Sequence, residues 1–320
     1  MDLRYKALRN NWYPERYHGR KKQKTFFEGW YFKLECPEQA FTLALIAGIS
    51  MNKTGEREAF IQYLIKPGGE SVYHAFKLDE FQASENEFNL SIGSNQFSMD
   101  GIKLELPELK GNLVLVNHQR WPKSILKPNI MGPLGYWPGL NCYHAIVSMR
   151  NSIKGQLVYK NQTIVLDDGL GYIEKDWGKS FPEKHIWMQC NRFSNQQTSL
   201  SLAIAPVQIL GQSVLAYAVI LKLNHRDYLF TTYHLSKFKG SGDAEDLRLE
   251  FKSRRHQLEI CASMKDSQAM RIPNLEGMKG LVHESLEASI EFALKDRTDS
   301  AIIAKDRSAE AAMELSGKWF

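Results

Sequence analysis

Two short stretches of the sequence place acidic side chains among aromatic ones. Residues 26–33 contain Glu28 next to a glycine, within a run dominated by phenylalanine, tyrosine and tryptophan. Residues 171–191 contain Glu174 and Asp176 and are also rich in aromatic side chains. A carboxylate buried alone is too costly, so such an acid must be paired or protonated. Both stretches therefore predict either structural ion pairs or a carboxylic acid that donates a proton.

The acids of the second stretch would share one face of a strand with a tyrosine. Side chains two residues apart point to the same side of a strand, which aligns Tyr172, Glu174 and Asp176. Burial can raise a carboxyl pKa from ~4.3 by up to ~3–5 units, enough to keep an acid protonated near neutral pH. Such an acid could protonate an alkene, and aromatic faces could stabilise the resulting cation by ~0.5–2 kcal/mol each. We take Glu174 as the candidate acid and Asp176 as the second candidate. The structural alternatives are ion pairs of Glu174 with Lys184, of Asp176 with Lys175, and of Glu28 with Lys33 or an early arginine.

A mixture of amide, acidic and aromatic side chains marks the candidate binding residues. Amides are disfavoured in a plain core. The mixture instead suits a pocket that positions a polar head group and shelters an apolar tail, so we expect an apolar small molecule as substrate or ligand. The candidate residues are Glu28, Trp30, Tyr31, Tyr172, Trp177, Trp187, Gln189 and Asn191.

The sequence gives no motif for a metal or a cofactor. The nine histidines show no paired metal-ligand spacing, and the four cysteines form no C-x-x-C pair. No G-x-S-x-G elbow is present, and residues 169–171 lack the third glycine of a nucleotide-binding loop. Residues 142–144, Cys-Tyr-His, are interpreted as core strand rather than as a nucleophile and its base. We expect neither metal nor cofactor.

The elements that must position these residues are β-strands. Period-2 alternation of apolar and polar residues predicts about twenty strands, with no amphipathic helix longer than two turns. Short strands at this spacing predict an all-β protein of two tandem antiparallel units, closed as lipocalin-like barrels or sandwiches. Residues 120–141 contain four prolines and are expected to form a lid or a covering strap.

An internal repeat supports the tandem arrangement. Self-similarity at an offset of about half the chain indicates duplication. The predicted parts are a basic N-terminal arm (1–24), an N-terminal β domain (25–175) and a C-terminal β domain (176–320). The matching positions are Trp30 with Trp187, Leu43 with Leu200, and Leu45 with Leu202.

Charge is concentrated at the N-terminus. The net charge is +5, and residues 1–24 alone carry eight lysines and arginines against two acids, with Trp12, Tyr13 and Tyr17 among them. This pattern suits an anionic membrane surface, and the alternative is a solvated arm whose aromatics pack on the body. Nothing resembles a nucleic-acid-binding motif, so no nucleic-acid partner is expected. The longest apolar run, residues 41–51, is about half the ~20 residues of a spanning helix. We expect a cytoplasmic protein, with any membrane contact peripheral.

The two aromatic stretches resemble the tocopherol cyclase family. Its members share an F-E-G-W-Y-F-K opening and a central E-K-x-W-G, F-P-x-K, W-x-Q-C-N block. The matching positions here are 27–33, Glu174, Lys175, Trp177, Gly178, Phe181, Pro182, Lys184, Trp187 and 189–191. Asp176 departs from the family's asparagine, and Lys179-Ser180 from its glycine run.

The resemblance implies a two-part β fold related to lipocalin-like proteins. It also implies cofactor-free closure of a chromanol ring, in which a phenol oxygen adds to a prenyl double bond. The expected function is therefore acid-catalysed cyclisation of a prenylated hydroquinone or related isoprenoid. Two alternatives remain: a non-catalytic binding protein for an isoprenoid or other lipid, and hydration of an alkene, which begins with the same protonation.

Overall fold

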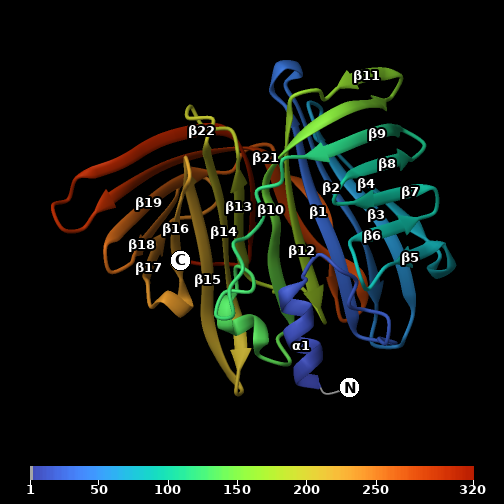
Figure 1. Cartoon of the computed structure of the whole chain (residues 1–320), viewed down its shortest axis with the longest axis horizontal. Coiled ribbons are helices and arrows are strands. Elements are labelled where there is room, and N and C mark those ends of the chain that lie inside the picture. The colour runs from blue at the N-terminus through green and yellow to red at the C-terminus, as the bar shows by residue number, and fades with distance from the viewer. Residues whose placement is uncertain (1–2) are drawn as a thin grey trace. The chain divides into compact units, whose positions relative to one another are not determined.

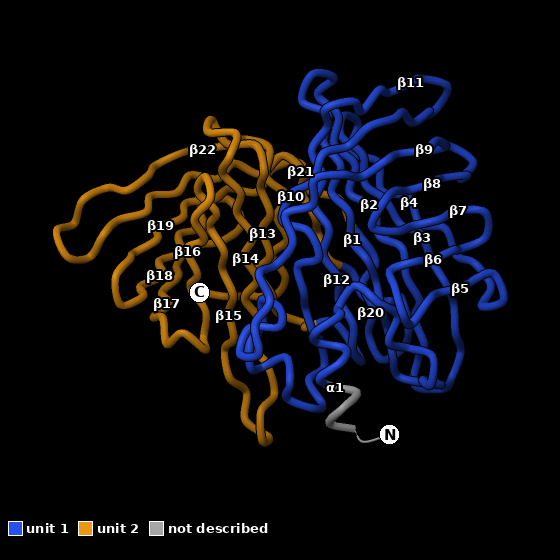
Figure 2. The backbone as a smooth tube through the Cα atoms, in the orientation of Figure 1, with its two compact units in different colours: residues 1–181, 270–281 blue, residues 182–269, 282–320 orange. Residues whose placement is uncertain are grey.

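The structure is a computed structural model that describes residues 3–320 (Figure 1). These residues form two antiparallel sheets of 12 and 10 strands. The chain divides into two compact units: unit 1 comprises residues 1–181 and 270–281, and unit 2 comprises residues 182–269 and 282–320 (Figure 2). The all-β class and the two antiparallel lipocalin-like units expected from the sequence are confirmed. The predicted domain limit after Lys175 falls inside the strand Gly169–Gly178.

The sheet of unit 1 runs in the order β4-β3-β2-β1-β12-β10-β9-β8-β7-β6-β5, and β11 pairs with β10. Its central strands β1 and β2 are rich in apolar and aromatic residues and are buried on both faces. The strands are β1 (Phe26–Cys36), β2 (Phe41–Met51), β3 (Arg57–Lys66), β4 (Glu70–Phe76), β5 (Phe81–Ala83), β6 (Asn89–Ile92), β7 (Asn95–Ser98), β8 (Gly101–Glu105), β9 (Leu109–Val116), β10 (Cys142–Tyr159), β11 (Gln162–Val165) and β12 (Gly169–Gly178).

This sheet curls onto itself around a filled interior. Phe32 on β1 stacks on Phe97 on β7 with ring centroids 5.8 Å apart, although four strands separate β1 from β7 in the sheet order. Trp30 stacks in the same way on Phe88. Aromatic and aliphatic side chains from opposite walls thus pack together. The interior of unit 1 is a packed apolar core, so the chemistry must be sought elsewhere.

The second sheet has the order β16-β15-β14-β13-β22-β21-β19-β18-β17, with β20 paired to β21. It curls in the same manner, because Tyr217 on β15 contacts Phe238 on β17 with ring centroids 5.5 Å apart. The strands are β13 (His185–Cys190), β14 (Thr198–Ile209), β15 (Gln212–Leu223), β16 (Arg226–Thr231), β17 (Lys237–Ser241), β18 (Leu247–Lys252), β19 (His256–Ser263), β20 (Gln268–Asn274), β21 (Gly277–Asp296) and β22 (Ile302–Ser316).

The two sheets share one strand plan. In each, the first strand of the unit (β1 or β13) lies between a consecutive hairpin strand and the last strand of the sheet in sequence (β12 or β22). The equivalence of the two tryptophans is nevertheless wrong in detail. Trp30 points into its core, whereas the core residues of β13 are Ile186, Met188 and Cys190, which places Trp187 on the opposite face. A register difference of one residue reverses every side chain of a strand.

A helix that alternation did not predict opens the chain. α1 spans Leu3–Trp12, two residues before Pro14. The segment after it is anchored: Tyr17 donates its backbone N–H to the Ser84 carbonyl oxygen, and His18 is buried. Among the described residues, no helix has the length and apolar character needed to cross a membrane.

Candidate active site

The pairing of β1 with β12 sorts the predicted site residues onto two faces of one sheet. Tyr31 lies opposite Glu174, and Trp30 lies opposite Lys175. Side chains of paired residues point to the same side of a sheet. Trp30 belongs to the core, so its row faces the interior of unit 1. The interior row holds Glu28, Trp30 and Trp177, and the opposite face holds Tyr31, Tyr172, Glu174 and Asp176.

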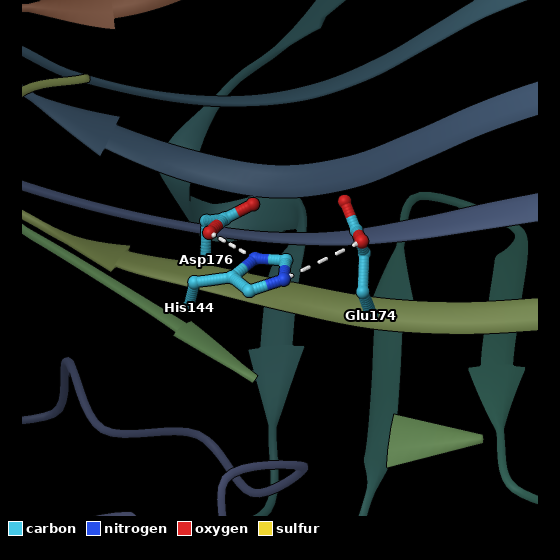
Figure 3. A group of neighbouring side chains, drawn as sticks. All are labelled: His144, Glu174 and Asp176. Atoms are coloured by element: carbon cyan, nitrogen blue, oxygen red, sulfur yellow. Dashed lines mark hydrogen bonds and ion pairs between the residues drawn. The ribbon is translucent and has the colours of Figure 1, made fainter. Parts of the chain in front are cut away.

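On the face turned away from the core, a histidine joins the two acids. His144 on β10 is the register partner of Asp176. Its Nδ1 lies 3.0 Å from Asp176 Oδ1, and its Nε2 lies 3.8 Å from Glu174 Oε2. The Tyr172 hydroxyl donates a 2.6 Å hydrogen bond to Glu174 Oε2. Figure 3 shows the imidazole between the two carboxylates, an arrangement we call the carboxylate–histidine cluster.

The carboxylates set the charge of the imidazole. Burial alone would lower the pKa of His144, but the nearby Asp176 and Glu174 carboxylates outweigh it and raise that pKa from 6.5 to about 9. The imidazole is therefore protonated at neutral pH. Burial and the same two carboxylates raise the pKa of the Cys142 thiol well above its ordinary value, so it stays protonated. Cys142 is thus not an activated nucleophile.

The sequence interpretation missed His144. Residues 142–144 were assigned to core strand by their alternation, and nothing local links them to residues 174–176 about thirty positions later. Only the antiparallel register of β10 with β12 brings them together. The register shifts after Ile146, on the same strand, and such bulges often occur beside active sites.

The three side chains of the cluster are also close enough for a shared metal ion, since their ligand atoms lie within 4.8 Å of one another. One imidazole and two carboxylates form a common set of ligands for divalent ions. In the arrangement observed, however, the ring nitrogens already face carboxylate oxygens at hydrogen-bond and ion-pair distances. A metal would have to displace the imidazole proton. As it stands, the arrangement places groups that can give and accept a proton next to one another.

Glu28 occupies a different environment, in a fully buried ion pair. Its carboxylate pairs with the Lys175 ammonium and accepts the His18 backbone N–H at 2.9 and 3.0 Å. Burial raises the pKa of Glu28 and lowers that of Lys175 to about 8, and each charge opposes the effect of burial on the other. Lys33, the partner considered from the sequence, instead lies 3.1 Å from Glu35 on the opposite face.

The tryptophans of the interior face pack around this ion pair. The Lys175 ammonium lies 4.5 Å from the centre of the Trp30 ring and 5.4 Å from that of Trp177. Trp30 donates its indole N–H to the Glu15 carbonyl oxygen at 2.8 Å, and Trp177 stacks on Tyr143. Lys175 also donates to the Arg16 carbonyl oxygen. Glu28 and these rings hold the segment that follows α1 against unit 1.

The proline-rich segment 120–141 is a strap fixed on unit 1. Its buried Asn129 donates an amide hydrogen bond to the Asn11 Oδ1 atom at 3.1 Å, and Asn11 donates to the Gly135 carbonyl oxygen. Its Met131 sulfur lies 3.2 Å from the backbone nitrogen of His144. A cavity of about 20 Å³ beside the strap has room for about one water molecule. The strap thus packs over the β10 end that carries the cluster.

The other predicted binding residues lie in unit 2 on β13 and just after it. Trp187, Gln189 and Asn191 are buried, and alternation places them on the face opposite the unit 2 core. The same face carries His185, whose Nε2 lies 3.0 Å from Glu314 Oε2 on β22.

Comparison with known proteins agrees with the fold and with the central motif. The sequence matches the tocopherol cyclase-like family over residues 121–317, and the chain belongs to that family. A rice (Oryza sativa subsp. japonica) protein named probable tocopherol cyclase, chloroplastic, is 24% identical over 177 residues, which is 52% of this chain and 38% of that protein. The chain thus spans well under half the length of this relative.

Solved structures show the same architecture at low sequence identity. A Nitrosomonas europaea protein assigned as AttH has a TM-score of 0.56 and 13% identity, covering 91% of this chain and 92% of its own. CghA, solved with Sch210972, has a TM-score of 0.55 and 10% identity, and the match covers 91% of this chain and 88% of CghA. Kievitone hydratase from Nectria haematococca has a TM-score of 0.51 and 9% identity, and the match covers 91% of this chain and 89% of the hydratase. At these identities the likeness shows the fold alone.

Proposed function

We propose that the chain catalyses the addition of an O–H group across an alkene of a prenylated hydroquinone or related isoprenoid, without a cofactor. The observation that carries this proposal is the carboxylate–histidine cluster, where a protonated imidazole lies between two carboxylates and a tyrosine hydroxyl bonds one of them. Such a site can both give and accept a proton. When the O–H group is the substrate's own phenol, the product is a closed ring.

Within the cluster, Glu174 delivers the proton and His144 replenishes it. The imidazolium transfers its Nε2 proton to Glu174, after a slight side-chain rotation shortens their 3.8 Å separation to the hydrogen-bond range of ~2.7–3.2 Å. Glu174 then protonates the alkene and leaves a tertiary carbocation. The phenol oxygen forms the new C–O bond with that carbon, and its proton passes to the neutral imidazole. Substrate and product are isomers, and the enzyme regains its starting protonation.

Asp176 and Tyr172 act as positioning residues. Asp176 holds the imidazole through Nδ1 and keeps Nε2 directed towards Glu174. The Tyr172 hydroxyl bonds Glu174 Oε2 and fixes the rotamer of that side chain. Tyr31, the register partner of Glu174, lies on the same face, where its ring can stabilise a carbocation. The rice relative's name, probable tocopherol cyclase, supports the choice of a phenol as the attacking group.

Two other functions start from the same residues. Hydration would use water in place of the phenol, and the name kievitone hydratase attaches this reaction type to a protein of the same fold. A binding protein would hold the isoprenoid unchanged. Incubation with a prenylated hydroquinone separates all three: cyclisation gives a product of equal mass, hydration gives one heavier by one water, and binding returns the starting compound. Full activity in the presence of a chelator is expected, and loss of activity would instead indicate a metal at the cluster.

The pKa of His144 predicts a pH dependence. Because the folded-state pKa is raised from 6.5 to about 9, folding takes up a proton between these values. Its contribution to stability is therefore complete below pH 6.5 and is lost as the pH rises to about 9. Turnover, which needs the imidazolium, should fall over the upper part of this range. Melting temperatures of the wild type and His144→Gln across pH 6–10 test this, and parallel curves for the two proteins would contradict it.

A further inference from the structure

A buried glutamine in unit 2 lacks any partner for its amide. Gln189 on β13 is fully buried, and neither its Nε2 nor its Oε1 has a hydrogen-bond partner within residues 3–320. Buried polar groups are almost always hydrogen-bonded, because an unmade bond leaves the desolvation of the group uncompensated. An orphaned amide in a folded protein therefore needs an explanation.

The strands on either side of Gln189 carry small side chains next to it. Its register partners on the two neighbouring strands are small: Ser201 on β14 and Ala312 on β22. Trp187 lies two residues earlier on the same face, also next to an alanine, Ala203. A long polar side chain flanked by small residues and a tryptophan has the composition of a ligand subsite. The charged pair on this face, His185 and Glu314, is in contact at 3.0 Å, whereas neither polar atom of the Gln189 amide has a hydrogen-bond partner among the described residues.

We propose that Gln189 is the polar anchor of a ligand subsite in unit 2 and hydrogen-bonds a hydroxyl or carbonyl oxygen of the bound molecule. A primary amide both donates and accepts, so a hydroxyl is the group that it satisfies most completely. A phenolic hydroxyl of a prenylated hydroquinone meets this requirement. The choice of this phenol as the ligand group rests on the proposed function. The observation that the Gln189 amide has no hydrogen-bond partner among the described residues is independent of it.

Two buried glutamines provide a matched experiment. Gln62 on β3 is as buried as Gln189, but its amide is fully used: Nε2 donates to the Arg271 carbonyl oxygen at 3.1 Å, and Oε1 accepts the Arg271 N–H at 2.8 Å. Methionine fills nearly the same volume without the polar atoms. We expect Gln189→Met to raise the Tm of the unliganded protein by about 2–4 °C and Gln62→Met to lower it.

Ligand binding provides the second measurement. The wild type should bind a prenylated hydroquinone about 3- to 10-fold more tightly than its O-methylated analogue, and Gln189→Met should lose this preference. A lower Tm for Gln189→Met would show that the amide has a structural partner and would overturn the proposal. A higher Tm with the preference intact would overturn the ligand role. Binding without turnover would refute the proposed catalysis and leave the subsite standing.

A separate observation concerns the strap of unit 1, where two adjacent aliphatic side chains are held in solvent. Ile125 and Leu126 are 78% and 70% exposed. They form the tip of a tight turn closed by two 3.0 Å backbone hydrogen bonds between Ser124 and Lys127. The Tyr136 hydroxyl bonds the Ile125 carbonyl oxygen at 3.0 Å and fixes the tip. A rigid turn that presents large apolar side chains to water has no folding advantage.

The charge around this tip indicates what covers it. From residue 109 to residue 166 the sequence contains no acidic residue but seven lysines and arginines, among them Lys127, which directly follows the tip. Apolar side chains at the tip of a basic segment match the surface of an anionic bilayer, where the aliphatic groups enter the acyl boundary and the cations face phosphates. The geometry points to Ile125 and Leu126 as the residues that dock the protein on such a bilayer.

Vesicle sedimentation tests the docking tip. Wild-type protein should bind phosphatidylcholine vesicles that contain phosphatidylglycerol, and binding should weaken with salt. The double variant Ile125→Ser/Leu126→Ser should have a vesicle affinity at least roughly tenfold lower, because the free energy gained by moving these aliphatic side chains out of water is lost. The matched control is Leu210→Ser, at a turn in unit 2 where the side chain is 83% exposed. Unchanged binding by the double variant, or an equal loss in the control, would overturn the assignment.

Discussion

Replacing Glu174 with glutamine is expected to lower turnover of a prenylated hydroquinone by about 10²–10⁴-fold, the usual contribution of general acid–base catalysis. The amide keeps the size of the side chain and can still accept the Tyr172 hydroxyl hydrogen bond. It cannot carry a proton from His144 to the substrate. The folded fraction should change little, because the carboxylate is replaced by a group that still hydrogen-bonds. Initial rates and circular dichroism of the same preparation measure the two effects.

The control for this variant is Glu70→Gln. Glu70 also accepts a tyrosine hydroxyl, that of Tyr159, but at the surface of β4 rather than in the cluster. It should retain full activity. Full turnover by folded Glu174→Gln would transfer the acid role to Asp176, and full turnover by Asp176→Asn as well would refute acid catalysis at this site.

The second large effect concerns stability. Glu28→Gln should lower the free energy of unfolding by about 3–5 kcal/mol, because it leaves the Lys175 ammonium buried without its counter-charge. The loss should also loosen the segment after α1, since the Lys175 ammonium that Glu28 holds in place donates to the Arg16 carbonyl oxygen. Chemical denaturation measures the change. Glu276→Gln is the control: its ion pair with Lys53 is exposed, and such pairs contribute about 0–1 kcal/mol. Similar values for the two variants would contradict the structural role of Glu28.

The sequence predicts the class of fold well because strand periodicity is local. Alternation predicted most of the strands, among them the one that carries Tyr172 and Glu174, which is β12. It did not predict α1, since a ten-residue helix with a mixed surface has no period-2 signature and only a weak helical one. It also matched Trp30 with Trp187, although their strands differ in register by one residue, which sequence similarity does not detect.

The candidate site was only partly predictable for the same reason. Tyr172, Glu174 and Asp176 lie on one strand, and alternation placed them on one face correctly. His144, which contacts these acids, and Glu28, which pairs with Lys175, lie on other strands. Only the pairing register of the strands brings them into contact. Glu28, Trp30 and Tyr31 are all candidate binding residues by sequence, but successive residues of a strand point to opposite faces. Glu28 and Trp30 therefore face the core of unit 1, while Tyr31 faces the cluster.

The most direct test of the account is the reaction of a prenylated hydroquinone in D₂O. If Glu174 protonates the alkene with a proton that exchanges with solvent, the cyclised product carries one deuterium on the carbon of the former double bond. We predict that the wild type gives this product and that folded Glu174→Gln gives none above background. Recovery of unchanged substrate from the wild type, or a ring closed without deuterium at that carbon, would contradict proton transfer by the carboxylate–histidine cluster.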